Sequence, residues 1–244
     1  MKAWIQLDNW NKRMGGTLVH SNVSNKSGDN FQQILDNYLA VKNGKFGIDN
    51  IIYSSFQNLE KSIVTLINSV GLNSLIVNSS FGKGNWANVP WLSIIDQARP
   101  ATMQDGEYIV YLFKSDMSGF YLTLNQGVTE PLKHGKKKGT AILEGTASKL
   151  RNSLSNEDKQ RLTESSFNLN NRIFLAKTGL GAKYEPGTII HKFYNAGSLP
   201  TEEELIEDLR LLIDIYLKLP KDINKSDENM IKVGEQVGLY DGIE

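Results

Sequence analysis

Two apolar runs joined by a short polar turn constrain the fold of this chain more than any other feature. Gly106–Phe113 reads GEYIVYLF and Gly119–Asn125 reads GFYLTLN, with SDMSG in the middle. Ser, Asp and Gly are turn residues, so the pattern predicts a β-hairpin. In the first run, alternation places Tyr108 and Leu112 on one face and Tyr111 on the other, and both faces are apolar. We therefore expect this run to be a central strand.

The rest of the chain mixes helical and strand patterns. Apolar residues recur at helical spacing in four segments, 30–41, 54–70, 140–154 and 199–219. Short apolar runs predict further strands at 75–81, 167–177 and 187–194. Ser54 or Ser55 is the expected cap of the second helix, and Thr201 with Glu204 forms a capping box for the last. Leu39 is expected to lie on the apolar face of the first helix. The last helix is expected to bury a stripe of five residues, namely Leu205, Leu209, Leu212, Ile213 and Tyr216.

These elements do not alternate as βαβ units, which favours an α+β fold. We predict a mixed, curved β-sheet flanked by helices in a single main domain over residues 30–219. Residues 1–29 are predicted to be an N-terminal extension or linker, because SNVSNKSGDN is polar and irregular. Residues 220–244 are predicted to be a polar tail or linker.

Composition narrows the class of protein. The 244 residues contain no cysteine, which removes disulfides and thiolate chemistry and fits a cytoplasmic location. No run is long and apolar enough for a membrane span, so we expect no membrane partner. The 27 basic and 27 acidic residues cancel, yet they are segregated: KHGKKK at 133–138 is basic, and TEEELIEDL at 201–209 is acidic. A basic face can therefore exist on a neutral molecule.

The sequence contains no convincing catalytic or cofactor motif. GKGN does not match the phosphate-loop pattern, because its lysine stands between the glycines. His20, His134 and His191 are far apart, and neither a zinc-protease motif nor a serine-hydrolase elbow is present. His191 is expected to be a hydrogen-bonded structural residue, and His134 to face solvent or phosphate. We therefore predict a protein that is not an enzyme and has no cofactor.

One segment carries a resemblance to a known family. SFGKGNWANVPW at 80–91, followed by DGEYIVYLF and GFYLTLNQGVTE, resembles the N-terminal DNA-binding domain of McrB-type modification-dependent restriction systems. In that family an S-F-G-x-G-N-[FW] segment leads to P-W, and a G-x-Y strand and an aromatic strand follow. The later stretch from TGLGAKYEPGTII into the acidic-start helix is also similar, so the resemblance covers about residues 74–219.

The resemblance implies that the domain reads a modified base in DNA after flipping it out of the duplex. In that family the pocket consists of the tryptophan of P-W, the tyrosine of G-x-Y and an aliphatic residue four positions on. The matching residues here are Trp91, Tyr108 and Leu112. Flat aromatic walls can replace the stacking that a flipped base loses, which suits Trp91 and Tyr108. From the residues alone, core is favoured over a pocket for all three; with the resemblance, the pocket is favoured for Trp91 and Tyr108, and Leu112 fits either role.

A second set of residues is expected to contact DNA outside the pocket. Glycines allow close backbone approach, and lysines contact phosphates. The set comprises Ser80, Gly82, Lys83, Gly84, Asn85, Lys133, Lys136 and Lys137. Lys83 stands where the family has an aromatic residue, so we expect it to contact phosphate or a base edge. Trp86 is expected to anchor the loop, and the basic 133–138 segment fits a solvated turn as well as it fits a phosphate contact.

The sequence thus favours a non-catalytic module that recognises a modified base, 5-methylcytosine or a related modified cytosine, in double-stranded DNA. In the family, cleavage comes from an AAA+ GTPase motor and a nuclease subunit, in cis or in trans. Two alternatives stay open: a metal-dependent nuclease, and a protein-interaction module of a defence system that uses the acidic helix as its surface.

Overall fold

A computed structural model describes residues 27–99, 106–177 and 181–220 of the chain. The α+β class and the single domain are confirmed. In chain order the elements are α2 (Ser27–Lys42), α3 (Ile51–Ser69), β1 (Leu75–Gly82), β2 (Trp86–Asp96), β3 (Glu107–Phe113), β4 (Gly119–Gln126), α4 (Thr129–Leu132), α5 (Lys136–Ser153), α6 (Asn156–Glu164), α7 (Gly181–Tyr184), the 3-10 turn η1 (Glu185–Gly187), β5 (Thr188–Asn195) and α8 (Glu202–Lys218).

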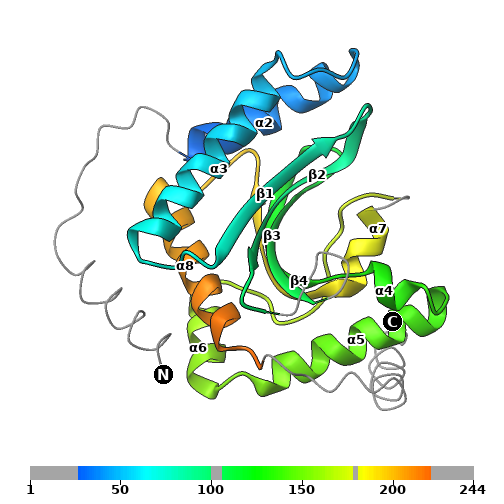
Figure 1. Ribbon diagram of the computed structural model, residues 1–244, viewed down its shortest axis with the longest axis vertical. Helices are drawn as coiled ribbons and strands as arrows, with labels where there is room; N and C mark the ends of the chain where they lie inside the picture. Colours follow the sequence, from blue (N-terminus) through cyan, green and yellow to red (C-terminus); the bar gives the residue numbers. More distant parts are fainter. Residues whose placement is uncertain (1–26, 100–105, 178–180, 221–244) are drawn as a thin grey trace.

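The five described strands form one sheet in the order β1-β2-β3-β4-β5, and each strand pairs with its sequence neighbour. Every pairing is antiparallel, where a mixed sheet was expected, because each strand runs opposite to the strand before it in the sequence. Figure 1 shows the strands bending strongly, with α2, α3 and α8 on the convex side. The concave side faces α7.

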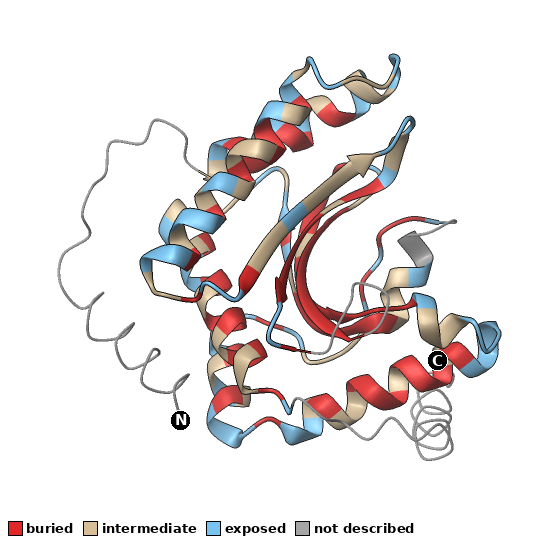
Figure 2. Ribbon diagram, viewed as in Figure 1, coloured by how far each residue is buried: buried red, intermediate tan, exposed pale blue. Residues whose placement is uncertain are grey.

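The central position expected for the GEYIVYLF strand is confirmed. All seven residues of β3 are buried, and β3 pairs with β2 on one side and β4 on the other. Figure 2 shows buried residues nearly throughout β3 and β4. The Ser115–Gly119 turn is held by Asp116, whose Oδ1 accepts from the backbone N–H of Ser118 at 3.0 Å. The neighbouring β2 strand was not expected from the sequence.

The main hydrophobic core lies between the convex face of the sheet and the helices. Phe31 of α2 stacks on Phe120 of β4 with ring centroids 4.4 Å apart, and Phe120 also lies 4.9 Å from Tyr194 of β5. Phe56 of α3 meets Phe113 edge to face at 5.6 Å. Aromatic pairs of this kind add to the stabilisation from area burial alone.

The helix termini follow the expected chemistry in part. The capping box at α8 is confirmed: the Thr201 side chain accepts from the backbone N–H of Glu204, and the Glu204 carboxylate accepts from that of Thr201. All five predicted stripe residues of α8 are buried. The second helix begins earlier than predicted, at Ile51, with Asn50 as its cap in place of Ser54 or Ser55. Asn50 accepts from two backbone N–H groups, so it satisfies donors that a later serine cannot reach.

Two further details of the first helices differ from expectation. The first helix begins at Ser27, so the last residues of the segment predicted to be a linker are helical. Leu39 is 44% exposed, because it lies beside the buried stripe of α2, which runs through Phe31, Ile34, Leu35 and Tyr38. The remainder of the predicted extension and tail lies outside the described residues.

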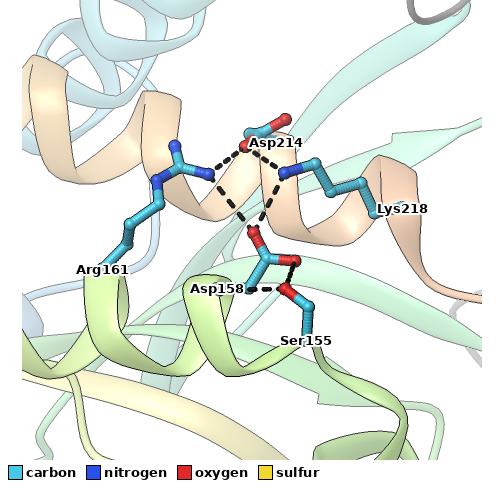
Figure 3. Close-up of polar contacts among 5 residues, drawn as sticks. All are labelled: Ser155, Asp158, Arg161, Asp214 and Lys218. Atoms are coloured by element: carbon cyan, nitrogen blue, oxygen red, sulfur yellow. Dashed lines mark hydrogen bonds and ion pairs between the residues drawn. The ribbon is translucent and has the colours of Figure 1, made fainter.

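An ion-pair network joins α6 to α8 (Figure 3). Asp158 and Asp214 each contact both Arg161 and Lys218, at distances of 2.6 to 3.3 Å. The Ser155 hydroxyl also donates to Asp158 at 2.8 Å and accepts from its backbone N–H. Burial raises the pKa of the Asp158 carboxyl, but the hydrogen bonds and charges of Lys218, Ser155 and Arg161 outweigh it and hold that pKa below its usual value.

Candidate nucleic-acid interface

The concave face of the sheet brings two of the three expected pocket residues side by side. Trp91 of β2 is the cross-strand partner of Leu112 of β3, and Ser80 of β1 is the partner of Trp91 on the other side. The same row continues through Tyr121 of β4 to Phe193 of β5. Cross-strand partners have side chains on the same face, so these five residues form one row across the sheet.

Tyr108 lies on the same face as Leu112, four residues earlier in β3. The three expected pocket residues belong to, or pack against, one apolar cluster that is separate from the main core. Their exposure differs: Tyr108 is 3% and Leu112 is 1% exposed, whereas Trp91 is half-buried. Trp91 is therefore the member of the trio that a ligand reaches first.

A segment from Asn168 to Lys177, which we call the strap, supplies the cover over this cluster. Ile173, Leu175 and Ala176 are buried in the same cluster as Tyr108 and Leu112. The strap is held at one end by paired hydrogen bonds of Asn168 with His191, and near the other by the Ser115 N–H, which donates to Leu175 at 2.9 Å. The expected pocket residues thus pack in one cluster with apolar side chains of the strap.

The prediction of a strand at 167–177 is wrong. The strap makes one isolated bridge, from Asn168 to His191 of the edge strand β5, and no further strand pairing, because its later residues Ile173, Leu175 and Ala176 pack in the apolar cluster of the concave face. The Asn170 side chain accepts from the Arg172 N–H at 2.8 Å, which bends the backbone locally. The alternating apolar residues of the strap therefore pack against the sheet and do not form a strand.

Burial also sets the protonation of two groups on this face. Burial raises the pKa of the Tyr108 hydroxyl, and the nearby Tyr184 raises it further, so Tyr108 is neutral. Burial lowers the pKa of His191 to about 4. Its Nε2 lies 3.0 Å from Asn170 Oδ1, which matches the hydrogen-bonded structural role expected for His191.

The glycine-rich segment forms the tip of the β1–β2 hairpin. Lys83, Gly84 and Asn85 are exposed there. Gly82 has φ of 132°, and a Cβ at this position would lie 2.0 Å from the Asn85 carbonyl oxygen, so this tight turn requires glycine. Ser80 and Gly82 form its base, where the pairing register shifts.

An aromatic cluster fixes this hairpin to the helices. Phe81 and Trp86 pack with Phe46, and the Trp86 indole N–H donates to the Gly44 carbonyl at 3.2 Å. The Tyr38 hydroxyl contacts the carbonyls of Phe81 and Ala87 at 3.2 and 2.7 Å. The expected anchoring role of Trp86 is consistent with these contacts, and the tip projects from a rigid base.

The basic segment forms the corner between α4 and α5. Lys136 and Lys137 lie in the first turn of α5 and are exposed, as is Lys133. Lys133 pairs with Glu130 at 2.7 Å, and both side chains are largely solvated. Positive charge at a helix N-terminus is unfavourable, and the Gly135 cap supplies no side-chain acceptor, so an anion would stabilise this turn.

The hairpin tip and the basic corner do not meet. Figure 1 shows them at opposite ends of the concave side, with α7 between them, and Figure 2 shows both as exposed. The site residues predicted from the sequence thus fall in three places: a covered apolar cluster in the middle and a polar projection at each end.

A large cavity lies elsewhere. It has a volume of about 870 Å³, opens between α2, α3 and the start of α8, and includes Tyr111 on the convex side of the sheet. Glu202 and Glu203 line it, and none of the predicted site residues does. Its acidic rim does not suit a phosphate backbone.

The described residues contain neither a metal-binding cluster nor a membrane-spanning helix. Within residues 27–99, 106–177 and 181–220, no group of three or more histidine or acidic side chains is placed to hold a metal ion. No helix in that part of the chain is long and apolar enough to cross a membrane.

The fold and the site therefore define a small α+β domain with a curved antiparallel sheet. A covered apolar cluster lies on its concave face, with a polar projection at each end. Comparison with known families gives a match to the MrcB-like N-terminal domain over residues 33–221. Because the match covers most of the chain, the protein belongs to this family. No curated protein matches, and no solved structure matches.

Proposed function

We propose that this domain is the specificity module of a modification-dependent restriction system and that it reads a modified cytosine in duplex DNA. The base would flip from the duplex and enter the apolar cluster of the concave face, with Trp91, Tyr108 and Leu112 as its walls. The observation that supports this most is the cross-strand pairing of Trp91 with Leu112, with Tyr108 on the same face. The family membership of the chain supports the DNA-binding role.

The cost of flipping the base is similar in size to the gain from stacking it in the pocket. Unstacking a base costs a few kcal/mol, and aromatic stacking returns about 1–3 kcal/mol per base. The indole of Trp91 is half-buried, so part of its surface is available for stacking without rearrangement. A methyl group on the cytosine would add apolar contact with Leu112, which is the kind of difference that selects modified over unmodified bases.

Entry of the base requires the strap to move. Ile173, Leu175 and Ala176 occupy the cluster in the free protein. The middle of the strap is held by single hydrogen bonds outside the sheet pairing: Ser115 donates to Leu175, the Phe174 N–H donates to the Tyr121 hydroxyl at 3.4 Å, and the Leu175 N–H donates to the Glu185 carboxylate at 3.1 Å. A base that replaces the apolar contacts of these three residues would offset the cost of their displacement.

Contacts to the DNA backbone would come from the two ends of the concave side. The exposed hairpin tip carries Lys83, and the corner before α5 carries Lys133, Lys136 and Lys137. Their charges would set affinity and orientation, while the pocket sets specificity. Cleavage would be left to an AAA+ GTPase motor and a nuclease subunit, in cis or in trans, and this domain would have no catalytic role.

The test is a binding comparison on one short duplex in unmodified, 5-methylcytosine and 5-hydroxymethylcytosine forms at physiological salt. Wild-type protein should prefer a modified form. Trp91→Ala should lose about ten-fold or more of that affinity, and Trp91→Phe, which keeps a flat ring, should lose less. Circular dichroism melting should show that both variants fold. Equal binding of the three forms by wild-type protein would contradict the proposal.

A further inference from the structure

The outer surface of the strap has a composition that the pocket does not explain. Arg172, Phe174 and Lys177 are exposed, while Ile173 and Leu175 between them are buried. Phe174 is 51% exposed, the second-largest exposed fraction among the exposed large hydrophobic residues of the described chain. An aromatic side chain set between two cations is a pattern suited to nucleic acid, since rings stack on bases and cations meet phosphates.

A second exposed ring lies next to the strap. Phe193 of β5 is 38% exposed, and its ring centroid is 4.8 Å from that of Tyr121. The Tyr121 hydroxyl accepts from the backbone N–H of Phe174 at 3.4 Å. Tyr121 thus packs its ring on Phe193 and accepts a hydrogen bond from the backbone of Phe174. We call Tyr121, Phe174 and Phe193 the aromatic ledge.

The ledge is continuous with the proposed pocket. Tyr121 is the cross-strand partner of Leu112, and Phe193 is the partner of Tyr121, so they extend the row that begins at Ser80 and Trp91. Lys114 adds a cation on this side, with its ammonium 5.7 Å from the Phe193 ring centroid. Asp116 pairs with that ammonium at 3.4 Å, so the local charge is mixed at this edge and basic along the strap.

We propose that the aromatic ledge is a second nucleobase-binding site, in which Phe174 and Phe193 stack on a base that neighbours the flipped one. This rests on the proposed function for the position of the DNA, but stacking itself requires only an unpaired or partly unstacked base. Arg172 and Lys177 contact the phosphates on either side of that base. The inner face of the strap packs in the pocket cluster. A base that binds the outer face would therefore also affect the position of the strap.

The rigidity of the ledge supports this role. Tyr121 also meets the His191 ring edge to face at 5.7 Å, and His191 is fixed by Asn170 of the strap. Gly119, at the start of β4, leaves room for the Phe193 ring: a Cβ there would lie 2.6 Å from its Cζ. The Phe193 ring is therefore held in place while it stays 38% exposed, which lowers the entropy cost of stacking.

The experiment compares Phe174→Ala and Phe193→Ala with wild-type protein on three probes: the methylated duplex, the unmodified duplex and a single-stranded oligothymidine of about a dozen nucleotides. Each substitution should weaken binding to the single strand and to the methylated duplex by about 5- to 100-fold. Phe174→Tyr should restore most of the affinity. Leu39→Ala, at a 44% exposed apolar residue of α2, is the matched control and should bind like wild type.

The outcomes separate the two proposals. Loss of single-strand binding in the two alanine variants supports the ledge, even if wild-type protein ignores the modification and the pocket proposal fails. Wild-type affinity of both variants on every probe overturns the ledge and leaves the pocket proposal to the Trp91 variants. If wild-type protein binds none of the probes, both proposals fall.

Discussion

The two faces of the sheet are built from the same strands but are covered in different ways. On the convex face, α2, α3 and α8 bury a large core that includes Phe31 and Phe120. The carboxylate of Asp208 on this face is paired within the protein, because it accepts from Lys192 and from the Tyr194 hydroxyl. On the concave face a smaller cluster is covered by one strap, with exposed aromatic and basic residues beside it.

This difference indicates that one face of the sheet stabilises the fold and the other is available for binding. The convex face is covered by packed helices, and the cavity that opens there between α2, α3 and α8 has an acidic rim that does not suit a phosphate backbone. The concave face is covered by an irregular strap that lies outside the sheet ladder, and such a segment opens at lower cost than a paired strand or a packed helix, so it can exchange its apolar contacts for those of a ligand. We therefore expect substitutions on the convex face to change stability, and those on the concave face to change binding.

The largest expected difference is in stability, between substitutions at two adjacent residues of β4 whose side chains lie on opposite faces of the sheet. Phe120→Ala removes a fully buried ring and should lower the free energy of unfolding by about 3–5 kcal/mol. Tyr121→Ala removes a half-buried ring on the concave face and should cost about 1–2 kcal/mol. Urea denaturation followed by circular dichroism measures both.

The comparison is sharpened by measuring DNA affinity on the same two variants under conditions where each is folded. Tyr121→Ala should weaken binding more than Phe120→Ala, although it is the more stable variant. Equal costs in stability, or stronger loss of binding in Phe120→Ala, would mean that the two faces are not functionally distinct.

The contrast between local and long-range signals also explains what the sequence could predict. The SDMSG hairpin and the Thr201–Glu204 box depend on residues close in sequence, and both are confirmed. The strap was mistaken for a strand because Ile173 and Leu175 alternate with outward residues, which suits a strand as well as a segment lying over a sheet. Only the contact with Tyr108, distant in sequence, distinguishes the two.

The candidate site shows the same limit. The alternation of β3 predicted that Tyr108 and Leu112 share a face, but their burial under the strap could not be deduced from it. The ledge was missed for a related reason. Phe174 was assigned to a strand, although the order Arg172, Phe174, Lys177 was present as a signal in the sequence.

A second prediction separates the faces by pH. His191 on the concave side has its pKa lowered by burial to about 4, below the value of about 6.5 expected in the unfolded chain. Between these values the unfolded chain binds a proton that the folded chain does not. Stability should therefore be complete above about pH 6.5 and fall towards pH 4, by up to about 1.4 kcal/mol per pH unit. His191→Gln should flatten that part of the curve.

The network between α6 and α8 should act in a lower window. The folded-state pKa of Asp158 is held below its usual value, so its charge stabilises the fold above about pH 4 and the stabilisation is lost as pH falls through the folded value. Asp158→Asn should cost about 1–2 kcal/mol at neutral pH and flatten the curve only below about pH 4. Thermal melts of both variants from pH 3 to 8 measure this, and interchanged windows would contradict the assignment.

The smallest effect concerns the exposed lysines at the edge of the concave side. Lys136→Gln and Lys137→Gln should leave stability nearly unchanged, because both side chains are solvated and a lysine at a helix N-terminus is mildly unfavourable. If these lysines contact phosphates, each substitution should reduce the slope of log affinity against log salt by about one. Lys61→Gln, an exposed lysine of α3 on the convex side, is the control and should leave the slope unchanged. A slope that falls equally in all three variants would indicate a general charge effect, and the distinction between the two faces would then rest on the aromatic residues alone.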